Sequence, residues 1–208
     1  MRRASFAAIA AALVILTGCA GTLVKTPVSD DYYPELKKGQ QWEYSLEYTT
    51  PSAGLQKGTI LVSVDGYEEI NNKRYFRAVT SFSGISNLDA SLTYYRKSPE
   101  GIHKIYGRHI NVPEFVEIPF PMAIGQTWTV TDPDGPLEYT AEGLETVKTP
   151  YQTYQNCLKV SFRSQDRSAG YEGYSYHAPG VGEVKMVMKL NGSRVEYVLK
   201  DYKLLASR

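Results

Sequence analysis

The stretch Gln41-Trp42-Glu43-Tyr44-Ser45-Leu46-Glu47-Tyr48 alternates large apolar or aromatic side chains with polar ones. Successive side chains of a β-strand point to opposite faces of the sheet, so this pattern predicts a strand with one buried and one wet face. The same period of two recurs in residues 60–65 and 195–200. Antiparallel sheets often bury only one face, and their strands alternate in this way. The sequence therefore predicts an all-β fold.

Turn-forming residues separate the alternating runs and are suited to closing hairpins. They are Asn71-Asn72, Ser98-Pro99-Glu100-Gly101, Asp132-Pro133-Asp134-Gly135, Pro179-Gly180 and Asn191-Gly192. We expect Pro179–Gly182 to join one strand, Tyr171–Ala178, to another, Gly182–Leu190. After the first eighteen residues no window carries a sustained helical stripe, which leaves room only for one-turn helices near Asp31–Leu36 or Pro150–Gln155.

Four motifs recur in the same order along the chain. Gly39-Gln-Gln-Trp42 returns as Gly125-Gln-Thr-Trp128, Gly66–Ile70 as Gly143–Val147, Phe76–Val79 as Leu158–Val160, and Tyr95, Gly101, Ile102 and Lys104 as Tyr176, Gly182, Val184 and Lys185. This order predicts a duplicated β-meander, with pseudo-repeats at about 34–118 and 119–208 and an extra loop at about 50–58 in the first copy. The alternative is that strand starts simply resemble one another. The segment Ile118–Ile124 holds two prolines, so it is expected to be the crossover between the copies, or a lip over a concave face, rather than a central strand.

A meander of about five strands cannot bury its own apolar face, whereas two copies can. We expect about 10–12 strands in a large curved antiparallel sheet or half-barrel, with a closed barrel or two packed sheets as alternatives. A ligand of such a fold would lie on its concave side.

The N-terminus predicts export. Arg2 and Arg3 precede an apolar run from Phe6 to Leu16, which at about eleven residues is shorter than the roughly twenty that a membrane-spanning helix needs. The run ends in Leu16-Thr17-Gly18-Cys19, which resembles the lipobox of bacterial lipoproteins. The resemblance implies cleavage between Gly18 and Cys19, and a diacylglycerol and an N-acyl chain on Cys19. It divides the chain into a signal peptide (1–18), a lipidated tether (19–33) and one β domain (34–208), although Tyr32 and Tyr33 are also candidates for the first contacts of the domain.

The charge balance bears on partners. The full chain has a formal net charge of +1, and removal of Arg2 and Arg3 lowers Lys plus Arg from 23 to 21 against 22 Asp plus Glu, which gives about −1. A near-neutral chain offers no electrostatic case for binding nucleic acid. Once Cys19 is acylated, only Cys157 remains, so no intramolecular disulfide can form, and we expect Cys157 to be a buried structural residue.

No catalytic or metal site is expected. The histidines, His103, His109 and His177, form no metal-ligand spacing, and nucleophile-elbow and phosphate-loop motifs are missing from the sequence. The carboxylates Glu43, Glu47 and Glu196 should face water, while a glycosidase-like pair of carboxylates across a cleft stays open. No cofactor is implied beyond the lipid on Cys19.

The two tryptophans, Trp42 and Trp128, are the candidate ligand-face residues. Aromatic side chains commonly line apolar pockets, but the matched places of these two in the repeat favour a role in the core. Each ring is expected to seed one half of the core.

Two resemblances concern the mature chain. The opening Tyr32-Tyr-Pro-Glu-Leu-Lys-Lys-Gly-Gln-Gln-Trp42, with Asn156–Val160 and Tyr176–Lys185, resembles a family of bacterial lipoproteins that begin Tyr-Tyr-Pro-Leu-x-x-Gly-x-x-Trp and carry Ala-Pro-Gly-Val-Gly. That family implies no activity. A fold-level analogy links the chain to the lipoprotein-localisation carriers, half-barrels that hold acyl chains, although fold alone does not transfer function.

These observations predict a non-enzymatic lipoprotein on the periplasmic side of the outer membrane. Ala20 is not the Asp that such families associate with inner-membrane retention. The first hypothesis is that a concave β face binds a lipid or other apolar ligand. The alternative is a structural or protein-binding envelope component with a filled core, and a cavity above about 300 Å³ would favour the first.

Overall fold

The computed structural model describes residues 26–86, 88–132, 135–166 and 170–204. Its main elements are two successive meanders of six strands. The first comprises β2 (Gln40–Thr50), β3 (Gly54–Ile70), β4 (Lys73–Ser83), β5 (Ser91–Ser98), β6 (Gly101–Tyr106) and β7 (Phe115–Pro119). The second comprises β9 (Thr127–Asp132), β10 (Gly135–Lys148), β11 (Thr153–Ser164), β12 (Tyr171–Ala178), β13 (Gly182–Leu190) and β14 (Ser193–Leu204).

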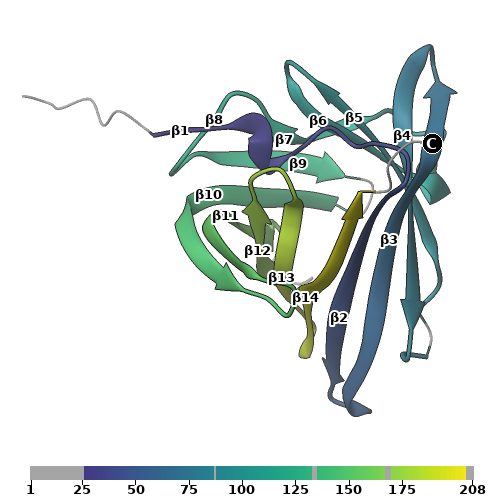
Figure 1. The fold of residues 1–208 in the computed structure, drawn as a ribbon, viewed down its shortest axis with the longest axis vertical. Coiled ribbons are helices and arrows are strands. Elements are labelled where there is room, and N and C mark those ends of the chain that lie inside the picture. Colours follow the sequence, from purple (N-terminus) through teal and green to yellow (C-terminus); the bar gives the residue numbers. More distant parts are fainter. Residues whose placement is uncertain (1–25, 87, 133–134, 167–169, 205–208) are drawn as a thin grey trace, which may run out of the picture.

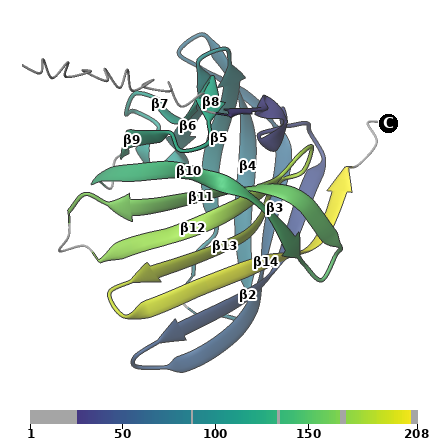
Figure 2. The same ribbon diagram turned by 90° about the vertical axis from the view of Figure 1, so that its left-hand side faces the viewer.

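The twelve strands form one antiparallel sheet in the order β7-β6-β5-β4-β3-β2-β14-β13-β12-β11-β10-β9. The first strand of one meander pairs with the last of the other, as in Leu46↔Tyr197, and this pairing joins the two halves. The sheet curls until its two halves face each other (Figures 1 and 2). The prediction of an all-β, curved antiparallel sheet of about 10–12 strands is confirmed.

The turn residues adopt the conformations that hairpins require. Asn71 and Asn72 both have positive φ, 52° and 61°, as do Asn191 and Gly192, at 48° and 80°. Such turns match the right-handed twist of the paired strands. The predicted hairpin across Pro179–Gly182 is confirmed, because β12 and β13 have the expected bounds and pair from Ala178↔Gly182 to Tyr171↔Leu190.

The extra loop expected at about 50–58 is mostly strand. Gly54 to Gly58 belongs to β3 and pairs with β2 from Thr50↔Gly54 to Leu46↔Gly58. The insertion satisfies its backbone hydrogen bonds by lengthening a hairpin, which is why it does not form an open loop. Of the two short helices considered, a 3-10 helix forms at η1 (Asp30–Tyr32), whereas Thr153 already begins β11. A second 3-10 turn, η2 (Gly107–His109), follows β6.

The two edge strands of the sheet, β7 and β9, are bridged by a side chain. The indole Nε1 of Trp128 on β9 donates to the carbonyl oxygen of Glu117 on β7 at 2.9 Å. Between the two strands, Ile118–Ile124 contains a cis Phe120–Pro121 bond and the short strand β8 (Met122–Ala123). This segment is the crossover between the meanders, as its prolines suggested.

The domain begins before Pro34, earlier than the sequence-based boundary. Strand β1 (Pro27–Val28) pairs with β8, and the buried Tyr32 donates its hydroxyl to the carbonyl of Asn156 at 2.8 Å. Lys97 Nζ donates to the Tyr33 carbonyl at 2.9 Å, and Gly180 N donates to the Asp31 carbonyl at 2.9 Å. Tyr32 and Tyr33 are therefore contacts of the fold. We call residues 27–36 the strap, since they cross the end of the barrel that carries the β12–β13 turn (Figure 1).

The predicted signal peptide, with Gly18 and Cys19, lies outside the described residues. Among residues 26–204, apart from the short gaps, no helix is long and apolar enough to cross a membrane.

Candidate functional site

A cavity of about 740 Å³ lies inside the curled sheet. Its walls are the inward-facing residues of both meanders, which alternate along each strand with residues of the outer face. Most of them are apolar: Leu46, Ile60, Val62, Phe76, Phe82, Val160, Phe162, Met186, Met188 and Val195. Cavities of roughly 300–1,000 Å³ with mainly apolar walls are typical of small-molecule sites.

The two ends of the cavity differ. At one end the strap covers it with Tyr33, Pro34 and Leu36. At the other end the lining includes Leu88 and Leu190, which are 37% and 39% exposed. Since these apolar side chains belong both to the wall and to the surface, we place the entrance at this end.

One side of the cavity wall carries a buried ion pair. Lys104 on β6 lies 2.7 Å from Glu117 on β7, and the lysine side chain is only 12% exposed. Burial alone would lower the pKa of Lys104, but the Glu117 carboxylate holds it well above its usual value. The lysine is therefore protonated, and the Glu117 carboxylate balances its positive charge.

The facing side carries Glu183 on β13. The hydroxyl of Tyr197 donates to the Glu183 carboxylate, and the hydroxyl of Tyr44 donates to the Glu183 backbone carbonyl at 3.0 Å. The pKa of Glu183 is raised to about 7, mainly by burial and also by the nearby Glu117, while the Tyr197 hydrogen bond and Lys104 partly oppose this rise. Within the described part of the chain, no lysine or arginine forms an ion pair with this carboxylate.

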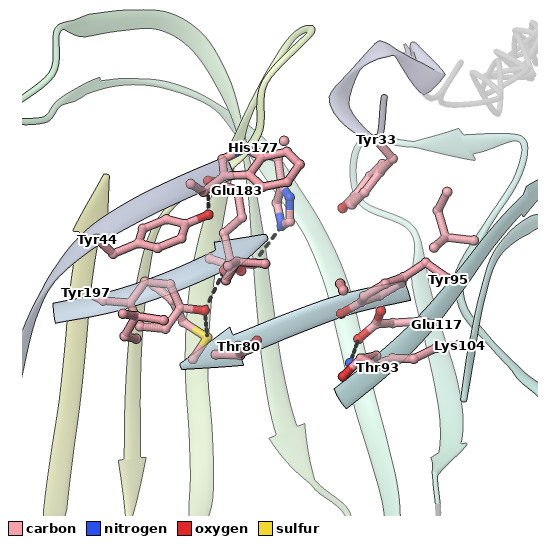
Figure 3. A pocket seen from close by; sticks show the side chains of 18 of the residues that line it. Tyr33, Tyr44, Thr80, Thr93, Tyr95, Lys104, Glu117, His177, Glu183 and Tyr197 are labelled. Atoms are coloured by element: carbon pink, nitrogen blue, oxygen red, sulfur yellow. Dashed lines mark hydrogen bonds and ion pairs between the residues drawn. The ribbon is translucent and has the colours of Figure 1, made fainter. Parts of the chain in front are cut away.

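Between these two sides lie Tyr33 and His177 (Figure 3). The Tyr33 hydroxyl is buried and, within the described residues, has no hydrogen-bond partner. Its ring centroid lies 4.7 Å from that of His177. The His177 Nε2 is 2.9 Å from Ser175 Oγ, and burial lowers the pKa of this imidazole to about 3, so it is neutral at neutral pH.

The two tryptophans do not have equivalent roles. Trp42 is 6% exposed, lines the cavity, and donates from Nε1 to the Val181 carbonyl at 2.9 Å. Trp128 is half-buried and stacks on Tyr139 with ring centroids 5.5 Å apart, at the seam between β7 and β9. Trp42 is thus both core and cavity wall, whereas Trp128 packs behind the wall.

Sequence reasoning did not find the polar side chains of the cavity. Ile102, Lys104 and Tyr106 all line the cavity, so Lys104 stands at a position of β6 where the alternating pattern would place an apolar residue. A charged residue at such a position is the feature of the sequence that could have indicated the site. Glu183 and His177 lie beside a bulge in the β12–β13 pairing, where the period of two shifts by one residue.

Cys157 is buried as expected, and the three carboxylates expected to face water are on the outer face, although the Glu196 side chain is only 20% exposed. Glu43, Glu47 and Glu196 lie on the outer face and pair with Lys200, Lys57 and Lys185. Cys157 is fully buried, and burial raises its pKa to about 11, which suits a structural thiol. In the described ranges, no group of three or more His, Cys, Asp or Glu side chains is placed to hold a metal ion.

No protein-family model matches the chain, and no curated protein matches it. A solved structure from Bacteroides fragilis, described as a candidate exported protein with a YmcC-like fold, is similar at 17% identity and TM-score 0.49, covering 81% of this chain and 97% of that one. A candidate lipoprotein from Parabacteroides distasonis gives 14% identity and TM-score 0.44, covering 83% and 98%. A β-barrel-like domain of unknown function from Brucella abortus gives 8% identity and TM-score 0.43, covering 81% and 99%. Likenesses this distant say nothing about function.

Proposed function

We propose that this protein is a non-enzymatic lipoprotein of the outer membrane, facing the periplasm, whose barrel binds a lipid or other apolar ligand. The observation that carries the proposal is the cavity of about 740 Å³ with its mainly apolar wall. A structural component with a filled core would bury these side chains against each other, since protein interiors are normally close-packed. Nucleic acid is not among the proposed partners.

Ligand binding is tested by filling the cavity. Thr80 on β4 lines the cavity, whereas its neighbour Ser81 lies on the outer face and hydrogen-bonds the Leu61 carbonyl. Protein purified from its native membrane should yield a bound apolar molecule in organic extracts analysed by mass spectrometry. Thr80→Trp should reduce that yield by about tenfold or more, and the matched Ser81→Trp should leave it unchanged.

The alternative function is a structural or protein-binding envelope component. It would be favoured if extracts of the native protein held no stoichiometric molecule and if Thr80→Trp and Ser81→Trp behaved alike. Melting temperatures of both variants show whether a loss of ligand reflects a filled cavity or an unfolded barrel.

The anchor is tested independently at Cys19. Cys19→Ser removes the thiol that the lipobox would acylate, so we expect loss of lipidation and of processing by the lipoprotein peptidase. Detergent partitioning and sensitivity to globomycin measure both effects. Two or more acyl chains anchor stably, so the native protein should stay in membranes at high salt. The lipoprotein proposal would be contradicted if the native protein were water-soluble and its processing were insensitive to globomycin.

A further inference from the structure

The charged groups inside the cavity do not balance. Lys104 and Glu117 neutralise each other across 2.7 Å, while Glu183 has, among the described residues, only the Tyr197 hydroxyl as a side-chain hydrogen-bond partner. Arg96 and Lys97 also border the cavity, but their charges are directed to Glu114 and Asp30, at 2.8 and 2.9 Å. When Glu183 is ionised, the polar part of the cavity therefore carries a negative charge that no described cation compensates.

The groups around Glu183 suit a positive charge. Aromatic rings present negative faces to cations, and aromatic walls with an acidic group are a common way to bind ammonium. The titratable side chains that face Glu183 come from the strap and from six strands: Tyr33, Tyr44 on β2, Tyr95 on β5, Lys104 on β6, Glu117 on β7, His177 on β12 and Tyr197 on β14.

The unpartnered hydroxyl of Tyr33 is a second, independent sign of a missing ligand. A buried hydroxyl without a partner is costly, and native structures rarely keep one. The Tyr33 side chain points into the same space as Glu183 (Figure 3). An ammonium group has three donors, so it can give one to the carboxylate and another to the hydroxyl oxygen.

We propose that the ligand of this cavity is an amphiphilic amine, with its ammonium group on Glu183 and Tyr33 and its apolar chain directed to the entrance at Leu88 and Leu190. This inference rests on the proposed ligand-binding function and narrows it to one head-group chemistry. A carboxylate or phosphate head group would be repelled by Glu183 and Glu117, and Lys104, which could attract it, is already paired with Glu117.

The experiment compares three ligands with one apolar chain. Decylamine, decanol and decanoate, each below its micellar concentration, are titrated calorimetrically into protein expressed from Ala20 onward, which retains every described residue. At pH 8 the amine should bind more tightly than the alcohol, and the carboxylate most weakly. Burial holds the Glu183 pKa near 7, so the amine should bind about tenfold more weakly at pH 5.5, where the carboxyl is protonated, while decanol should not change.

Two variants identify the group responsible. Glu183→Gln keeps the shape of the side chain and should weaken amine binding at pH 8 by about tenfold or more, remove its pH dependence, and leave decanol binding intact. The matched Glu196→Gln, on the outer face of β14, should behave as the native protein. Unchanged amine affinity in Glu183→Gln, or decanoate binding as tightly as decylamine, would overturn the head-group inference while leaving an apolar site. Failure of all three ligands to bind would instead contradict the proposed function itself.

Discussion

The two meanders place opposite charges at corresponding points of the cavity wall. In the first, Phe76 pairs with Tyr95 and Tyr95 with Lys104, across β4, β5 and β6. In the second, Leu158 pairs with His177 and His177 with Glu183, across β11, β12 and β13. The two meanders can be aligned because each has a bulge at an equivalent glycine, Gly66 in β3 and Gly143 in β10. Lys104 and Glu183 thus stand at the same place in the two halves.

What differs is the partner on the last strand of each meander. Lys104 meets the carboxylate of Glu117 on β7, so its charge is neutralised. Glu183 accepts a hydrogen bond from the Tyr197 hydroxyl on β14 and has no cation as a partner in the part of the chain that the structure describes, so its charge is not neutralised. The two meanders have the same number and order of strands but differ in charge at this point, and the position of the uncompensated charge predicts where a ligand head group binds.

The first prediction compares the two tryptophans. Trp42→Ala should destabilise the barrel by about 3–5 kcal/mol, because the ring is buried and its indole holds the Val181 carbonyl. Trp128→Ala should cost less, about 1–3 kcal/mol, since that ring is only half-buried. Denaturant melts measure both values. Equal losses would contradict the different burial of the two rings, and full stability of Trp42→Ala with lost ligand binding would assign Trp42 to the site alone.

The second prediction compares the contributions of two lysine–glutamate ion pairs to stability. Lys104 and Lys185 both pair with a glutamate on the following strand, at 2.7 and 2.9 Å, but only Lys104 faces the cavity. Lys104→Met should destabilise by about 3 kcal/mol because it leaves Glu117 charged and unpaired within the cavity. Lys185→Met should cost at most about 1 kcal/mol, because Glu196 lies on the outer face and keeps Arg194, at 2.6 Å, as a second partner. Denaturant melts at pH 7 measure the loss of stability of each variant. Equal losses would contradict the prediction.

The third prediction is a substitution that should stabilise the protein, in contrast to the first two. The Glu183 pKa is about 7 in the folded protein, above the usual value of 4.5, so the folded state holds this proton longer than the unfolded chain does. The group therefore lowers stability as pH rises from about 4.5 to 7, by up to about 3 kcal/mol. Glu183→Gln should remove this loss and be more stable than the native protein above pH 7.

Melts at pH 4.5 and pH 8 test this gain. The difference between variant and native protein should grow with pH, and the opposite contribution of His177 is common to both proteins. A difference that is constant with pH would mean that the Glu183 carboxyl is not held in a dry site.

The fold could be predicted further from the sequence than the site could. Period-two runs and turn dipeptides determine strands locally, so the β12–β13 hairpin was predicted to the residue. The repeat alignment matches Lys104 with Lys185, but only Lys104 faces the cavity. The bulge between Tyr176 and His177 places Glu183 toward the cavity and Lys185, two residues later, on the outer face, so Glu183 is the structural counterpart of Lys104. Bulges depend on how three strands fit together, and no single strand encodes them. The polar groups of the cavity were missed for that reason.

The last and smallest effect concerns Gly182, at the start of β13. It has φ of +89°, a conformation that costs other residues about 1–2 kcal/mol. A Cβ added there would meet only the Pro34 Cδ, at 3.8 Å, so the strain is in the backbone and not in packing. Gly182→Val should therefore destabilise by about that amount, with faster hydrogen exchange in the β12–β13 hairpin. Gly143→Val is the matched control, since Gly143 has no positive φ and a Cβ there meets nothing within 4 Å. If both variants melt alike, the positive φ of Gly182 is not what stabilises the β12–β13 hairpin.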